Sequence, residues 1–288
     1  MTTTQQQTII KEEAIKLFVF DEVYSFRAAE EQAEKKKLNA FGMMAKLNPL
    51  KRPKEDTVNL ARKESRYEPF WLVEAVRSVD YSSQITYPIT MNNPYVQWVN
   101  INGVDYEVAH NRDKSKIDVT AQENCYRKIN FNEYLDGLNR DVRREHFEGL
   151  MQKYHFSEME SFENDTIIEP LFPQQAAIQK ACSVLNGESI NAHKISEDVI
   201  TFEKIHLFFV PVFAFEFVWT AGDKSGVIEV NGLTGEITEN GQWYKDKLGD
   251  FVTRDMLIDL SADIASELVP GAGIAVKVAG RIAEHSKK

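Results

Sequence analysis

The sequence predicts an α+β protein built from two pseudo-repeated units, each a helix with an antiparallel sheet, and an α-helical C-terminal tail. Three observations lead to this prediction. Residues 208–219 form an almost unbroken apolar and aromatic run, which is typical of a strand covered on both faces. A related aromatic and proline pattern occurs near residue 67, and apolar residues recur at helical spacing after residue 253.

The run at 208–219 predicts the first strand of a three-stranded antiparallel meander. A turn-forming segment and a second apolar run follow it, which is the pattern of a hairpin. Asn231-Gly232 predicts the next turn, because both residue types accept positive φ. The segment 173–187 begins with proline and ends with Asn-Gly, as helices often do, and we expect it to cover one face of this sheet.

The two aromatic runs match each other in two blocks. In the first block, matched residues differ in number by a constant 142 (211 − 69 = 142). In the second block, each copy has an Asn-Gly pair, and the two pairs differ in number by 129 (232 − 103 = 129). Such short motifs recur by chance in sheet proteins, but two blocks in the same order favour a duplicated unit. The matched positions are Tyr67 with Phe209, Pro69 with Pro211, Trp71 with Phe213, Glu74 with Glu216, and Asn102-Gly103 with Asn231-Gly232.

The end of the second unit resembles a known family. Residues 229–237, EVNGLTGEI, are similar to the closing strand and turn of PepSY-type domains, small helix-plus-meander modules that include peptidase propeptide and inhibitor modules. Residues 52–56 and 66–71 also resemble a group of uncharacterised prokaryotic cytosolic proteins, a likeness that names no activity. The PepSY resemblance implies regulation or inhibition of a peptidase as one function to consider.

The remaining segments predict helices and a boundary. Residues 8–47 have helical features and are expected to end before Asn48-Pro49, because proline disfavours helix in the residue before it. Residues 140–154 also carry apolar residues on one helical side, whereas the acidic segment 157–165 predicts a linker. We therefore expect a first unit at 1–160, a second unit at 161–245 and a helical hairpin tail at 246–288.

Composition excludes several classes of protein. The net charge of −10 argues against a dedicated nucleic-acid-binding protein. Two cysteines, Cys125 and Cys182, are too few for a disulfide framework or a four-cysteine zinc site, and we expect buried free thiols. The first residues lack a basic stretch followed by an apolar one, so we expect a cytoplasmic protein.

The sequence contains no nucleotide-binding, hydrolase or zinc-protease motif, and none of its six histidines has zinc-finger spacing. We therefore expect no metal, no cofactor and no catalytic residue. Two alternatives for an enzyme stay open. Cys125, with Glu123 and His110 nearby in the chain, is a candidate nucleophile, and Glu74 with Glu216 is a candidate carboxylate pair.

The tail is the predicted binding surface. Its apolar residues fall on one stripe of each of two expected helices, with a Pro-Gly-Ala-Gly interruption between them. The stripe consists of Leu257, Leu260, Ile264 and Leu268, followed by Ile274, Val278 and Ile282. We expect a protein partner or self-association rather than a membrane surface, because these side chains supply little hydrophobic bulk. The sequence thus favours a non-catalytic protein-binding or scaffold protein, with a peptidase regulator or an unrecognised enzyme as alternatives.

Overall fold

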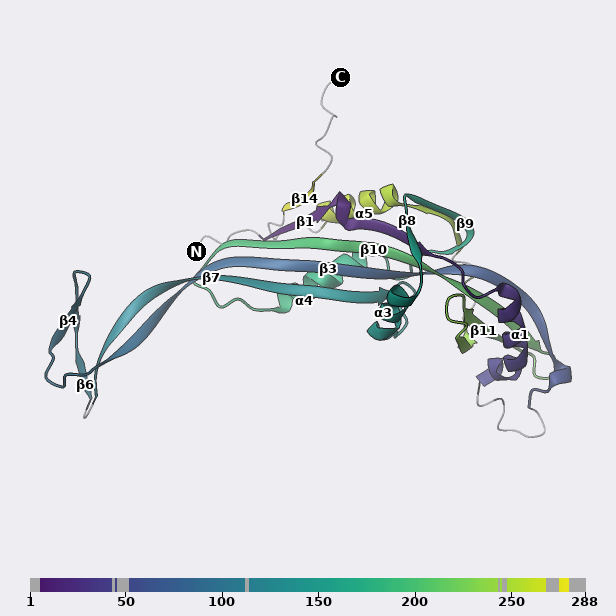
Figure 1. Ribbon diagram of the computed structural model, residues 1–288, viewed down its shortest axis with the longest axis horizontal. Coiled ribbons are helices and arrows are strands. Elements are labelled where there is room, and N and C mark those ends of the chain that lie inside the picture. Colours follow the sequence, from purple (N-terminus) through teal and green to yellow (C-terminus); the bar gives the residue numbers. More distant parts are fainter. Residues whose placement is uncertain are drawn as a thin grey trace, which may run out of the picture.

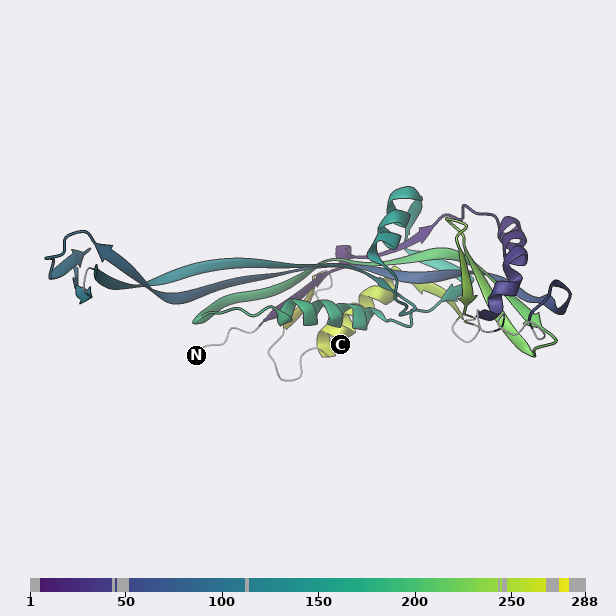
Figure 2. The same ribbon diagram turned by 90° about the horizontal axis from the view of Figure 1, so that it is seen from below.

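The computed structural model describes residues 6–42, 45, 52–111, 114–242, 244, 248–267 and 275–279, and the molecule is elongated (Figure 1). Three long strands run along it: β3 (Val58–Met91), β7 (Lys114–Asp136) and β10 (Lys194–Trp219). β3 and β7 continue past the body as a two-stranded ribbon, and we call residues 83–124 the arm (Figures 1 and 2). In the described part of the chain, no helix is long and apolar enough to cross a bilayer.

Shorter elements surround these strands. The other strands of the main sheet are β1 (Gln7–Lys11), β2 (Ile15–Phe20), β6 (Ala109–Asn111), β8 (Phe156–Met159), β9 (Ser161–Ile168), β11 (Lys224–Asn231), β12 (Ile237–Gly241), β13 (Leu248–Thr253) and β14 (Ala275–Ala279). A separate hairpin at the end of the arm consists of β4 (Trp98–Ile101) and β5 (Val104–Glu107). The helices are α1 (Phe26–Lys36), α3 (Arg144–Lys153), α4 (Gln174–Gly187) and α5 (Arg254–Glu267), with 3-10 turns at Glu12–Ala14, Lys37–Phe41 and Glu55–Thr57.

One twelve-stranded sheet joins all of these strands except β4 and β5, with the main order β12-β11-β10-β3-β7-β6. β10 makes the sheet continuous because it pairs with other strands along both of its edges. One edge of β10 pairs with β3 over almost its whole length, and the other edge is shared in succession by β1, β2 and β11. β1 and β2 run parallel to β10, whereas β3 and β11 run antiparallel to it, so the sheet is mixed but mainly antiparallel.

The two prolines of the matched sequences meet at the centre of this sheet. Tyr67 lies opposite Pro211, and Pro69 lies opposite Phe209. The carbonyl of Pro69 accepts a hydrogen bond from the N–H of Gly137 at 2.9 Å, and that of Pro211 accepts one from Gly232 at 2.8 Å. A Cβ on Gly137 would lie 2.5 Å from the Pro69 oxygen, and one on Gly232 would lie 2.8 Å from the Pro211 oxygen, so a side chain has no room at either place.

The predicted fold class is therefore wrong. The two matched segments do not form two helix-plus-sheet units, because they are neighbouring strands of one large sheet. The second matched block fails as well. Asn102-Gly103 forms the turn between β4 and β5 at the far end of the arm, whereas Asn231-Gly232 lies against Pro211 in the body. A short-range pattern of aromatic residues and proline identified strands correctly but could not say which strands pair.

Two predicted helices are also wrong. Residues 8–47 were expected to be helical, but they contain β1 and β2 before α1 begins, with Ser25 capping α1 by accepting the Ala28 N–H at 3.3 Å. Part of the expected second tail helix is β14, which pairs with β1 in parallel. Apolar residues fill most of β2 and alternate in β14, and pairing within the long sheet outweighs the modest helical preference of these segments. The domain boundaries at residues 160 and 245 stay predictions.

Helices cover both faces of the body. α4 and α5 pack on one face, where Trp71, Phe131 and Ile178 belong to the same apolar cluster. α3 packs on the opposite face through Phe147 and Leu150, against Phe70 and Phe208. α1 covers the end of the sheet formed by β10 and β11 (Figures 1 and 2). No described helix covers the arm, which is the part of the sheet that this core does not use.

Candidate functional site

The arm leaves the body where β10 begins. The N–H of His193 donates to the Ser82 carbonyl at 2.9 Å, and the Nδ1 atom of His193 accepts the N–H of Gln84 at 3.1 Å. Beyond this point β3 has no strand partner except β7 among the described residues. An isolated two-stranded ribbon is marginally stable in water, so the arm is presented by the long strands that continue into the body.

The ribbon has one apolar and one polar face, because side chains alternate along a strand. Ile85, Tyr87 and Ile89 share the apolar face and are 39%, 43% and 42% exposed. Their cross-strand neighbours on β7 are also apolar: Ala121, Val119 and Ile117. The residues between them, on the opposite face, are polar apart from Pro88, and Thr86 lies beside Thr120 there. The arm therefore exposes an apolar stripe along β3, which continues over half-buried Val119 and Ala121, whereas Ile117 is only 1% exposed.

The end of the arm carries the two most exposed aromatic side chains of the described residues, Tyr95 and Trp98. Tyr95 is 84% exposed, Trp98 is 64% exposed and Val104 is 53% exposed. Trp98 and Val104 belong to the β4–β5 hairpin, which Tyr95 precedes and which turns at Asn102 and Gly103, whose φ angles are 50° and 87°. These two residue types adopt positive φ most readily, so the turn is encoded locally. We call Tyr95, Trp98 and Val104 the tip.

Two carboxylates accompany the tip. Glu107 lies directly opposite Trp98 in the hairpin, and Asp105 accepts a hydrogen bond from Asn100 Nδ2 at 2.6 Å. Trp is enriched at protein–protein interfaces, and polar side chains lie at their rim. The tip therefore combines exposed aromatic side chains with two nearby carboxylates.

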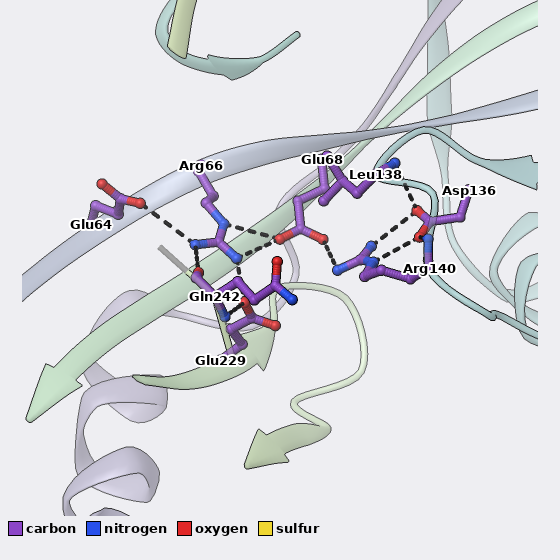
Figure 3. A network of polar contacts seen from close by, with 8 residues as sticks. All are labelled: Glu64, Arg66, Glu68, Asp136, Leu138, Arg140, Glu229 and Gln242. Atoms are coloured by element: carbon purple, nitrogen blue, oxygen red, sulfur yellow. Dashed lines mark hydrogen bonds and ion pairs between the residues drawn. The ribbon is translucent and has the colours of Figure 1, made fainter. Parts of the chain in front are cut away.

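A network of charged residues lies inside the body, away from the tip (Figure 3). Arg66 is fully buried and donates to Glu68 Oε1 from Nε at 2.9 Å and from Nη2 at 2.6 Å. It also donates to Glu229 Oε1 at 2.5 Å and to the Gln242 carbonyl at 2.8 Å. Arg140 continues the chain of contacts, because its Nη1 atom lies 2.8 Å from Glu68 Oε2.

Arg140 is held from the other side by Asp136, which accepts from Nε at 2.7 Å and from Nη2 at 3.1 Å. Burial opposes the charge of both arginines, but attraction to the carboxylates outweighs it and raises the pKa of Arg66 and of Arg140 above the usual value. Glu64 lies at the margin, 3.6 Å from Arg66 Nη1, and burial raises the pKa of its carboxyl. The network joins β3, β11 and the end of β7.

A hollow of about 330 Å³ lies beside this network. Its lining includes Glu68, Arg140 and Glu229, whose charged groups already bind one another, together with His146 and Tyr244. Both guanidinium groups face carboxylates at hydrogen-bond distance, so neither is free to hold an anionic ligand. The network therefore stabilises the junction of strands.

The structure does not bring Glu74 and Glu216 together. Glu74 lies 3.0 Å from Lys204 Nζ, and Glu216 lies 2.6 Å from Arg62 Nε. Both are cross-strand pairs between β3 and β10, and they lie on opposite sides of the sheet centre, roughly 40 Å apart along the strands. This separation does not suit shared acid–base chemistry.

Cys125 lies at the base of the arm, half-buried, opposite Tyr81. His110 is near the end of the arm, where its Nδ1 atom hydrogen-bonds Ser115 Oγ at 2.9 Å, about ten residues along β7 from Cys125. Glu123 accepts a hydrogen bond from Tyr87. The three groups proposed as a nucleophilic site are therefore not assembled. The other thiol, Cys182, lies in α4, and burial raises its pKa to about 11.

The predicted tail stripe is divided between core and surface. Leu257 and Ile264 are each 4% exposed and pack into the main apolar cluster, whereas Leu260 is 48% exposed on α5. Val278 lies in β14 opposite Ile10 of β1. Three further residues of the stripe lie outside the described residues: Leu268, Ile274 and Ile282.

Comparison of the chain with protein-family models, curated proteins and solved structures found no match. The resemblance to PepSY-type domains and to prokaryotic cytosolic proteins therefore stays a prediction. In the described residues, no three His, Cys, Asp or Glu side chains gather in a way that could hold a metal ion.

His206 is predicted to make the folding stability of the body depend on pH. Burial beside Phe18 and Phe208, followed by the charges of Lys204 and Lys16, lowers its pKa to about 4. An unfolded chain takes up this proton near pH 6.5, so it binds more protons than the folded chain between pH 4 and 6.5. Stability from this group is complete above pH 6.5 and is lost as the pH falls to 4.

We expect this loss to be about 1–3 kcal/mol, the lower part of the range reflecting the partial exposure of the ring. Urea unfolding of the wild type and of His206→Gln at pH 4.5, 5.5 and 7 measures it. The variant should lose less stability than the wild type on going from pH 7 to pH 4.5. Parallel curves for the two proteins would show that His206 does not titrate in this way.

Proposed function

We propose that this chain is a non-catalytic protein-binding protein that engages its partner through the tip of the arm. One observation carries the proposal: Tyr95, Trp98 and Val104 are exposed at the end of a ribbon that extends roughly 25 Å from the body. Large apolar side chains in such a position contribute nothing to the core. Large apolar side chains that stay exposed at the end of a ribbon, on either face of its terminal hairpin, support a role in binding.

The partner that fits the tip is a protein with an apolar groove bordered by basic side chains. The groove would receive the Trp98 ring, and the basic side chains would pair with Asp105 and Glu107, which lie beside it in the hairpin. The same carboxylates disfavour an anionic membrane surface, because they are repelled by its headgroups. Two free thiols, Cys125 and Cys182, suit the reducing cytoplasm, where we place this binding event.

The proposal is tested by placing a photo-crosslinking amino acid at Trp98 in native cells. The matched control carries the same amino acid at Thr86, which is exposed on the polar face of the arm. We expect one protein to be crosslinked at Trp98 and not at Thr86, and the same purified protein to bind this chain directly. Equal labelling at both positions, or labelling of lipid alone, would contradict the proposal.

With that partner purified, Trp98→Ala is expected to weaken binding by about 30-fold or more, because a central aromatic anchor commonly contributes 2 kcal/mol or more. Thr86→Ala should leave the affinity unchanged within about twofold. Isothermal titration calorimetry measures both, and circular dichroism checks that each variant folds. An affinity that is insensitive to Trp98 would place the contact elsewhere.

A further inference from the structure

Most of the outer edge of β7 pairs with no described strand. β7 pairs with β3 on one side, and on the other side its single strand partner among the described residues is β6, which reaches no further than Lys116. At the opposite end, the Asn132 carbonyl accepts a hydrogen bond from Arg144 Nη1 at 2.7 Å. Between Lys116 and Asn132 no described residue pairs with this edge, which leaves a stretch of backbone N–H and C=O groups open.

We propose that a second copy of this chain adds its own β7 to this edge, antiparallel, with a two-fold axis beside Cys125. This goes beyond the proposed function, since it concerns the edge of β7 and not the tip. The two copies would form one continuous sheet, and the same surface would meet itself, as in an isologous dimer.

The two edges of the arm differ in a way that favours β7. β3 carries Pro88 in the arm. Pro88 is four residues from Gln84 on the same strand, so the backbone nitrogens of both residues point toward the outer edge of β3, where the Gln84 N–H meets His193. Proline has no N–H to donate, and edge strands often carry it to prevent pairing with other chains. β7 has no proline between Lys114 and Asp136, so only the β3 edge is blocked in this manner.

Charge selects the register of the pairing. The backbone N–H and C=O groups that point to the outer edge of β7 belong to the even-numbered residues, as the bond from Arg144 to the Asn132 carbonyl shows. When the axis lies beside Cys125, Glu123 is opposite the partner's Arg127, and the symmetry repeats this contact. An axis at Glu123 or at Arg127 would set each charge against itself, which is destabilising in directly opposed strand positions.

The same register continues the apolar layer under α4. Ala121 of the arm would lie beside the partner's Ile129, and Val119 beside the partner's Phe131. Ile129 and Phe131 belong to the layer that α4 covers. Lys180 of α4 binds Glu133 of β7, and Val184 lies one helical turn after Lys180. Val184 therefore lies over this edge of β7, where it is 48% exposed. The half-exposed stripe of one arm would thus be covered by α4 of the other copy.

Arm residues at the pairing edge can be changed without touching the body. Asn124→Pro removes an outward N–H, so it should convert the protein from dimer to monomer, while Asn124→Ala should leave it dimeric. Sedimentation equilibrium at several concentrations distinguishes the expected dimer of about 66 kDa (2 × 33.0) from the 33.0 kDa chain. A wild type that stays monomeric at 100 µM, or an Asn124→Pro variant that stays dimeric, would overturn the proposal.

The register has its own test. A short bismaleimide should join two chains through Cys125, and Cys125→Ser should abolish the product, because Cys182 is partly buried in α4 and its thiol pKa is raised to about 11. Glu123→Arg alone should weaken dimerisation by about tenfold, and Glu123→Arg with Arg127→Glu should restore it. A dimer that forms without a crosslink at Cys125, or that the double exchange does not restore, would overturn this arrangement. Tip variants such as Trp98→Ala should not alter the mass, so failure here is distinguishable from failure of the proposed function.

Discussion

Arg66→Met is expected to lower the free energy of unfolding by about 3–5 kcal/mol, which is typical of removing one partner from a buried ion pair. Arg66 is fully buried, and it neutralises Glu68 and Glu229 at distances of 2.6 and 2.5 Å. Its loss leaves two carboxylates facing each other inside the protein, together with an unbonded Gln242 carbonyl. Urea denaturation at pH 7 measures the change.

The matched control is Arg27→Met. Arg27 pairs with Glu31 one helical turn away, and its side chain is 91% exposed, so the change should alter stability by less than about 0.5 kcal/mol. If Arg66→Met were no more destabilising than Arg27→Met, the network would not be what holds β3, β7 and β11 together. A role for its charged groups in binding a ligand at the adjacent hollow would then have to be considered.

Phe208→Ala should cost about 3–5 kcal/mol, as do large truncations in well-packed cores. Phe208 is 1% exposed and stacks against Phe18 and Phe70, with ring centroids 4.7 and 4.9 Å away. These rings come from β2, β3 and β10, so the cavity would open where three strands meet. Phe251→Ala on β13 is the control, because Phe251 is 53% exposed and fills no such space. A cost below about 1 kcal/mol for Phe208→Ala would mean that this layer repacks freely.

Local patterns identified several elements correctly. The aromatic run that ends at Trp219 is a buried strand, and the turn after it leads into β11 as expected. The helix predicted at 173–187 is α4. These features depend on neighbours in the chain, which is why spacing alone finds them. The partners of each strand depend on distant residues, and the sequence carries no local signal that β3 and β10 are adjacent.

The arm was missed for a related reason. Residues 84–91, QITYPITM, alternate polar and apolar side chains as a strand does, and this signal was present in the sequence. Alternation normally means that one face is covered, and nothing local shows that this stretch projects beyond its body. Residues 81–95 lie between the two matched blocks of the sequence, and they form the approach to the tip. The buried network could not be predicted either, because nothing near Arg66 in the sequence shows that the side chain of Glu229 binds it.

The central claim is that the arm serves binding and not folding. The most direct measurement is the affinity of the identified partner for a chain in which residues 84–122 are replaced by Asn-Gly, a turn that can join Ser83 to Glu123. We predict that this shortened chain keeps the thermal unfolding midpoint of the body, measured at a concentration where both chains are monomeric, and loses at least about 100-fold in affinity. A shortened chain that binds the partner as tightly as the full chain would contradict the account.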